Sequence, residues 1–175
     1  MSMDVSSAQQ TLRRTLLGHG AWMLLSSLVG GLGLWCFILG GFEIIPGFIV
    51  KFSLPGSEQG WVRCHTGPVA NALMVMGTGL AIPHLELPDG LAEKLGWIVM
   101  MDGWSNVGFY FFGNISPNRG LAFGTSRLGP SNIFSILALG PAYFFGVLAM
   151  GAFAVLGYHA LYGPSHTKPT LRKSH

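Results

Sequence analysis

Charged side chains divide this chain into four long apolar segments. Within the predicted spans the only charged side chain is Asp102. A helix needs about 20 apolar residues to cross the hydrocarbon core of a bilayer, and each segment is long enough. Lipid offers the backbone no hydrogen-bond partners, so a spanning segment of this kind must be helical. The pattern therefore predicts four transmembrane helices, at residues 15–42, 64–85, 95–115 and 133–158.

Composition points to the same class. Half of the 175 residues are hydrophobic and 10% are charged, whereas a soluble domain has about 25% charged residues. The hydrophobicity excludes a disordered chain, and two cysteines are too few for a disulfide scaffold. We expect an all-α integral membrane protein with a single domain at 1–163. A flexible tail at 164–175 and a disordered stretch at 1–11 complete the prediction.

The distribution of basic residues argues against a nucleic-acid partner. Although the formal net charge is +3, the lysines and arginines stand singly or in pairs between apolar segments. This placement is typical of residues that flank membrane spans. The two termini and the 86–94 loop together hold six of these residues, and the other two loops hold four. The bias predicts that both termini are cytoplasmic.

Small residues recur at a spacing that suits helix contacts in lipid. The chain has 26 glycines, and small residues let two helices approach closely where no hydrophobic force drives them together. Three pairs stand four residues apart, on one face of a helix: Ser26 with Gly30, Ser27 with Gly31, and Ala142 with Gly146. They predict close helix packing.

Polar side chains inside the spans are few, and each is a functional candidate because it is costly in lipid. His65 opens the second span just before Pro68, which the first turn of a helix tolerates. It is a candidate axial ligand of a metal or haem, or an interfacial histidine bonded to a backbone carbonyl. Asn71 lies about 9 Å further along and about 240° around the helix. One copy of this helix does not easily aim both at one atom, whereas two copies across a subunit interface do.

The third span carries two further candidates. Tyr110 requires a partner for its hydroxyl group in an apolar setting. It is either a hydrogen-bond donor to a substrate or bonded to Asn106 or Asn114, which lie one turn to either side. Asp102 either exchanges protons or binds a cation, or it pairs with a neighbour for structural reasons.

Two stretches carry a resemblance to a known family. Residues 65–71 (HTGPVAN) and 108–114 (GFYFFGN), with the order and spacing of the spans, resemble the membrane-bound styrene oxide isomerases over residues 12–162. The signature for covalent haem attachment, Cys-x-x-Cys-His, is absent, so any haem is held non-covalently.

The resemblance implies a homotrimer in a bacterial inner membrane, surrounded by lipid, with ferric haem b between subunits. It implies that His65 is the axial iron ligand and that Tyr110 and Asn71 hold the oxygen of an aryl epoxide. The implied reaction converts styrene oxide to phenylacetaldehyde by Lewis-acid ring opening and a 1,2-hydride shift, without net redox change. By charge alone, three arginines are candidates to hold the haem propionates: Arg63, Arg119 and Arg127.

Two other functions stay open at this point. A b-type electron-transfer cytochrome needs two histidines on one iron, and the possible pairs are His65 with His159 and His19 with His84. A small channel or transporter would use Asp102 and Asn106 and would contain no haem.

Overall fold

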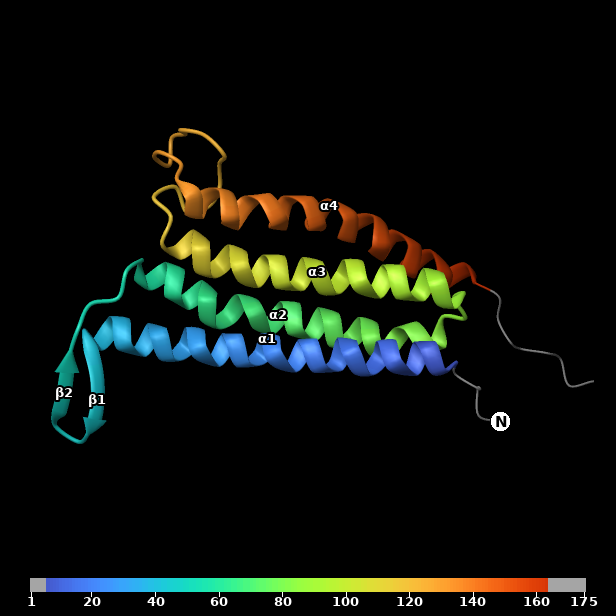
Figure 1. The fold of residues 1–175 in the computed structure, drawn as a ribbon, viewed down its shortest axis with the longest axis horizontal. Coiled ribbons are helices and arrows are strands. Elements are labelled where there is room, and N and C mark those ends of the chain that lie inside the picture. Colours follow the sequence, from blue (N-terminus) through green and yellow to red (C-terminus); the bar gives the residue numbers. More distant parts are fainter. Residues whose placement is uncertain (1–5, 164–175) are drawn as a thin grey trace, which may run out of the picture.

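A computed structural model describes residues 6–163 as four long helices that lie side by side, each antiparallel to the next (Figure 1). The predicted tail at 164–175 and the first five residues lie outside this range. The elements in chain order are α1 (Ser7–Leu39), β1 (Gly41–Ile45), β2 (Phe48–Lys51), α2 (Glu58–Ala81), the short 3-10 helix η1 (Ile82–His84), α3 (Asp89–Asn114) and α4 (Ile133–Tyr162).

Two of these helices, α1 and α4, are long and apolar enough to cross a membrane. Only 22% of the most apolar window of α1 and 17% of that of α4 is buried in the protein. Large apolar side chains cover their outer faces, including Leu28 (65% exposed) and Met150 (74% exposed). A soluble monomer rarely exposes an apolar surface of this extent, so both helices fit a lipid environment. That α2 and α3 also cross the bilayer stays a prediction.

The first helix, α1, begins earlier in the chain than the sequence indicated. The stretch 6–11, predicted to be disordered, belongs to the first turns of α1 and its cap. Ser6 caps the helix by accepting a hydrogen bond from the backbone N–H of Gln9. The buried Gln9 side chain donates to the Leu87 carbonyl at 2.9 Å and to the Asp89 carboxylate at 3.0 Å. Polar side chains thus tie the start of α1 to the start of α3, a contact that hydropathy does not reveal.

A β-hairpin corrects the expectation of an all-α fold. β1 and β2 pair antiparallel after α1 ends, in a stretch rich in isoleucine, phenylalanine and valine, which favour strands. Pro46 and Gly47 form the turn, and Gly47 has a φ of +84°, a conformation that glycine adopts at little cost. Most of the hairpin's apolar side chains are exposed, at the end of the bundle (Figure 1).

The start of α2 lies earlier than predicted, and this changes the place of His65. Ser57 caps the helix by accepting from the N–H of Gly60 at 3.1 Å. Pro68 therefore lies in the interior of α2 and not in its first turn, so the reason given for its tolerance is wrong. A proline inside a helix leaves the carbonyl four residues earlier without its bond. That residue is Cys64, whose carbonyl lies against Gly30 of α1.

The loop between α3 and α4 is held by buried polar side chains. The Ser116 hydroxyl group donates to the side-chain oxygen Oδ1 of Asn118 at 2.9 Å and lies 2.6 Å from the Ser135 hydroxyl group. Asn132 and Ser135 form a capping box that begins α4, as expected of this residue pair at a helix start. The loop that the sequence marks by its polar composition is thus a fixed cap.

The apolar core lies between α1, α2 and α3. Leu16, Met23, Val75 and Val99 are fully buried there. Close approach of α1 and α2 depends on small residues, since a side chain at Gly30 would overlap the backbone of α2. This confirms the close packing predicted for the Ser27–Gly31 region of α1.

Candidate functional site

His65 lies on the side of α2 that faces α1. Its Nδ1 atom is 3.0 Å from the backbone carbonyl oxygen of Ser27. The Ser27 hydroxyl group in turn donates to the backbone carbonyl of His65. One turn along α1, a Cβ atom placed on Gly31 would lie 2.7 Å from Nδ1. The backbone and one hydroxyl group of α1 therefore form a cradle that the imidazole fills.

This cradle selects one tautomer of the neutral imidazole. A carbonyl oxygen only accepts hydrogen bonds, so Nδ1 carries the proton and the Nε2 lone pair of the neutral ring is free. Histidines that ligate metals usually donate their second ring N–H to a carbonyl or carboxylate. The side chain is half-buried, so it is not sealed inside the bundle. His65 has the arrangement expected of a haem ligand.

The structure does not support the histidine pairs considered for a cytochrome within one chain. His65 and His159 are carried by α2 and α4, which both begin at the hairpin end of the bundle (Figure 1). At 1.5 Å per residue they lie about 10 Å and about 39 Å from that end, too far apart for one iron. His19 accepts a hydrogen bond on Nδ1 from the Trp104 indole at 2.9 Å, which leaves its proton on Nε2. In that state His19 offers no lone pair to a metal.

Tyr110 lies on the opposite side of α2, against Gly67. A side chain at Gly67 would overlap the tyrosine ring, so this glycine makes the space that the ring occupies. The Cys64 thiol donates to the backbone carbonyl of Tyr110 at 3.3 Å and helps to fix α3 against α2. The ring also meets the edge of Phe109, with centroids 5.9 Å apart.

The hydroxyl group of Tyr110 is not held by either neighbouring asparagine. Asn106 donates to the Asp102 carboxylate at 3.0 Å, and Asn114 accepts from the backbone N–H of Ser57 at 2.9 Å. Within residues 6–163 the tyrosine hydroxyl group has no hydrogen-bond partner. It is therefore free to donate to a ligand, and the structural alternative weighed for it fails.

Asn71 is 8% exposed and lies one turn after Gly67. Its amide nitrogen donates to the Gly67 carbonyl at 3.2 Å, which fixes the side chain and leaves its second N–H for another acceptor. Residues four apart lie nearly above one another on a helix, so Asn71 lies on the Gly67 side of α2. The structure thus groups Asn71 with Tyr110 but separates both from His65, because Gly67 is about 200° around the helix from His65.

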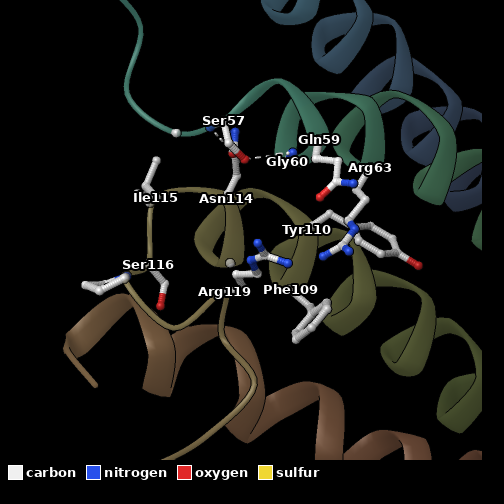
Figure 2. Close-up of a pocket in the computed structure, with 13 residues that line it drawn as sticks. Ser57, Gln59, Gly60, Arg63, Phe109, Tyr110, Asn114, Ile115, Ser116 and Arg119 are labelled. Carbon is white, nitrogen blue, oxygen red and sulfur yellow. Dashed lines mark hydrogen bonds between the residues drawn. The ribbon is translucent and has the colours of Figure 1, made fainter. Parts of the chain in front are cut away.

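A cleft of about 340 Å³ opens next to Tyr110, between the start of α2, the end of α3 and the following loop. Figure 2 shows the side chains of Arg63 and Arg119 extending into this space, with the Tyr110 ring beside Arg63. Arg63 precedes Gly67 by one turn and so continues the same side of α2. Arg127, the third candidate by charge, is not among the residues that line the cleft.

Asp102 has a partner of its own. It is 6% exposed, accepts from Asn106, and lies beside Gly146 of α4. No group of three or more metal-binding side chains forms around it or elsewhere in residues 6–163. The arrangement favours a structural role for Asp102, which is one of the two roles considered for it.

An apolar groove of about 390 Å³ lies between α2 and α4, beyond Asn71 toward the C-terminal end of α2. Its lining on α2 includes Met74, Thr78 and Ala81, the residues that follow Asn71 on the same helix face. One side of α2 therefore changes from charged at Arg63, through Gly67 and Asn71, to apolar. An amphiphilic ligand with one anionic edge matches this order.

Sequence reasoning missed the residues that position the candidates. Ser27 and Gly31 appear in the sequence only as a packing pair, and nothing local connects them to His65, 38 residues after Ser27. Gly67 lies within the HTGPVAN stretch without a visible role. The signal that was present is the spacing of small residues, which marks where a neighbouring helix approaches.

Comparison with known proteins places these observations in a family. The family model described as styrene oxide isomerase matches residues 12–161. A curated protein from Pseudomonas fluorescens, named styrene-oxide isomerase, is 55% identical over 148 residues. That match covers 85% of this chain and 88% of the relative.

Proposed function

Because the chain belongs to the styrene oxide isomerase family, we propose that it is an isomerase that converts styrene oxide to phenylacetaldehyde at a haem b bound between subunits. The observation that carries the haem proposal is the His65 cradle. Its Nδ1–H is taken up by the Ser27 carbonyl at 3.0 Å, and its Nε2 lone pair is left for iron. One protein ligand is also what this reaction requires, since a second one would close the iron to substrate.

The chain's residues divide into a ligand side and a substrate side. His65 would hold the haem iron through its Nε2 atom. When bound, ferric haem with a single protein ligand supplies an open coordination position that acts as a Lewis acid toward the epoxide oxygen. Tyr110 donates a hydrogen bond to that oxygen and stabilises the negative charge that develops on it as the ring opens. The second N–H of Asn71 fixes the direction of the oxygen.

Apolar surroundings complete the chemistry. Ring opening leaves positive charge on the benzylic carbon before hydride shifts to it, and water would trap that carbon as a diol. The groove between α2 and α4, beyond Asn71, is lined almost wholly by apolar side chains such as Met74, Leu156 and Phe153. It offers the aryl ring a dry place and keeps water from the reacting carbon. An epoxide of this kind also enters the lipid phase unaided, which suits a membrane protein.

The placement of the residues around α2 supports a site shared by two subunits. His65 faces α1. Asn71 lies on the other side of α2, about 240° around that helix from His65, and Tyr110 of α3 packs against Gly67, about 200° around. In a head-to-tail ring each subunit presents one surface to the neighbour before it and a different surface to the neighbour after it. His65 of one subunit then meets Tyr110 and Asn71 of the next. A homotrimer closes such a ring with three equivalent sites.

The test is a visible spectrum of the detergent-purified protein, followed by addition of styrene oxide. We expect a haem Soret band, a change in that band on adding the epoxide, and formation of phenylacetaldehyde. His65→Ala should lose the band. Absence of a Soret band in the unaltered protein, or a band with no aldehyde, would overturn the proposal. A band that resists amine and epoxide ligands would indicate two axial histidines and electron transfer instead.

A further inference from the structure

Two arginine side chains without a negatively charged partner lie in the cleft beside Tyr110. Arg63 projects from α2 and Arg119 from the loop after α3 into the same space (Figure 2). Neither guanidinium group has a hydrogen-bond or ion-pair partner among residues 6–163. None of the residues described as lining the cleft is acidic. Two like charges that share a cleft repel each other unless an anion lies between them.

The protein holds Arg119 in this place at a conformational cost. Arg119 has a φ of +61°, which is uncommon outside glycine and asparagine. The loop keeps that shape because the N–H of Gly120 donates to the side-chain oxygen Oδ1 of Asn118 at 3.0 Å and to the Ser116 hydroxyl group at 3.2 Å. Asn118 is fully buried and Ser116 is 7% exposed. A buried polar network thus directs this arginine into the cleft, whereas Arg127 in the same loop lies outside it.

The backbone of α2 just before Arg63 is held by the opposite wall of the cleft. Asn114, at the end of α3, accepts from the backbone N–H of Ser57 at 2.9 Å. The same side chain packs against Gly56 and Gly60, where a Cβ atom would overlap it. The first turns of α2 are therefore clamped to α3, and Arg63 emerges one turn later at a set distance from the loop.

We propose that Arg63 and Arg119 together form a carboxylate-binding site that holds the propionate groups of the haem. The inference rests on the proposed function and adds residues to it. A porphyrin has an apolar body and two carboxylates on one edge, and the side of α2 next to Tyr110 begins with Arg63 and continues through Gly67 and Asn71 without another charged side chain. Guanidinium groups bind carboxylates through paired, charge-assisted hydrogen bonds. The other source of such an anion is the phosphate of a lipid headgroup, which basic residues near a membrane surface also bind.

The experiment compares Arg63→Gln and Arg119→Gln with Arg127→Gln, a matched control in the same loop, all purified as holoproteins. Haem release to an excess of a haem-scavenging apoglobin is the first measurement. Each cleft variant should release haem about tenfold faster or more, because a hydrogen bond to a charged group is lost. The control should match the unaltered protein. Arg119→Lys, which keeps the charge but cannot form the paired hydrogen bonds, should recover only part of the retention.

A second measurement reports on the carboxylates themselves. The propionate bending mode in the resonance Raman spectrum should move to lower frequency in the two glutamine variants and stay in place in the Arg127→Gln control. Release rates and propionate modes equal to those of the unaltered protein would overturn the proposal. If those haem properties are unchanged while co-purified anionic lipid is lost, the ligand is a lipid phosphate and the proposal is wrong. Absence of haem from the unaltered protein would instead remove the proposed function itself.

Discussion

Gly31→Ala is the substitution that probes the His65 cradle most sharply. It adds one methyl group on α1 and leaves His65 and its hydrogen-bond partner unaltered. The new Cβ atom would lie 2.7 Å from Nδ1 and 2.9 Å from Cε1 of the imidazole. The ring, and not the α1 backbone, is the part that can move, because Gly30 next to it is already in contact with the backbone of α2.

The size of the effect follows from these distances. Nonbonded atoms settle about 3.5 Å apart, so the ring must move by about 0.8 Å to accept the methyl group. The bond from Nδ1 to the Ser27 carbonyl is 3.0 Å long, and a shift of this size lengthens it beyond useful range. Loss of the outer partner of a metal-bound histidine weakens metal binding by about 10- to 100-fold. Overpacking should also lower the free energy of unfolding by about 1–3 kcal/mol.

The assay is haem release from purified Gly31→Ala, with Gly18→Ala as the matched control. Gly18 lies in the same helix, and a Cβ atom there would meet nothing within 4 Å. The control should keep its haem and unfold at the same temperature or slightly higher, since alanine favours helix by about 0.5–1 kcal/mol over glycine. If Gly31→Ala holds haem as tightly as the control, the α1 cradle does not orient the ligand and the reasoning is refuted.

Three further substitutions test the substrate side and the loop. Tyr110→Phe should keep haem but slow turnover by about 100-fold, since one donor to the developing oxyanion is lost; unchanged kcat would remove Tyr110 from the chemistry. Gly67→Ala pushes on the same ring and should lower kcat with haem retained, whereas Gly18→Ala, which meets open space on α1, should have no effect on kcat. Ser135→Ala, read by thermal unfolding, should cost about 1–3 kcal/mol because the buried Ser116 hydroxyl group and the backbone N–H of Asn132 lose a partner; a wild-type melting curve would show that the loop network is dispensable.

Hydropathy predicted the helical segments well and their ends poorly. The four apolar segments all fall on long helices, because each has, apart from Asp102 in the third, no charged side chain over a length typical of a long apolar helix. Helix starts depend instead on single capping side chains such as Ser6 and Ser57, which look like ordinary polar residues in the sequence. The hairpin was missed because the residues between the first two spans were assigned no secondary structure. Its strand-forming residues and its Pro46–Gly47 turn were the available signal.

The candidate site was predictable only where it depends on one helix. The period of a regular helix alone places His65 and Asn71 on different sides of α2. The expectation that two copies of this helix face each other across a subunit interface therefore came from the sequence. The partners of these residues belong to other helices. That Ser27 accepts the His65 proton, that Gly67 makes room for Tyr110, and that Arg119 rather than Arg127 reaches the cleft all depend on tertiary packing. No local pattern encodes those contacts.

The central claim, a site assembled from two subunits, is tested most directly by mixing two inactive variants. His65→Ala and Tyr110→Phe carry different affinity tags, are produced together, and are purified over both tags so that only mixed oligomers remain. In a head-to-tail trimer one of the three sites then has both residues intact, and isomerase activity should return to about a third of the unaltered level. Activity no higher than that of Tyr110→Phe alone would contradict the account, because it would mean that His65 and Tyr110 act within one subunit.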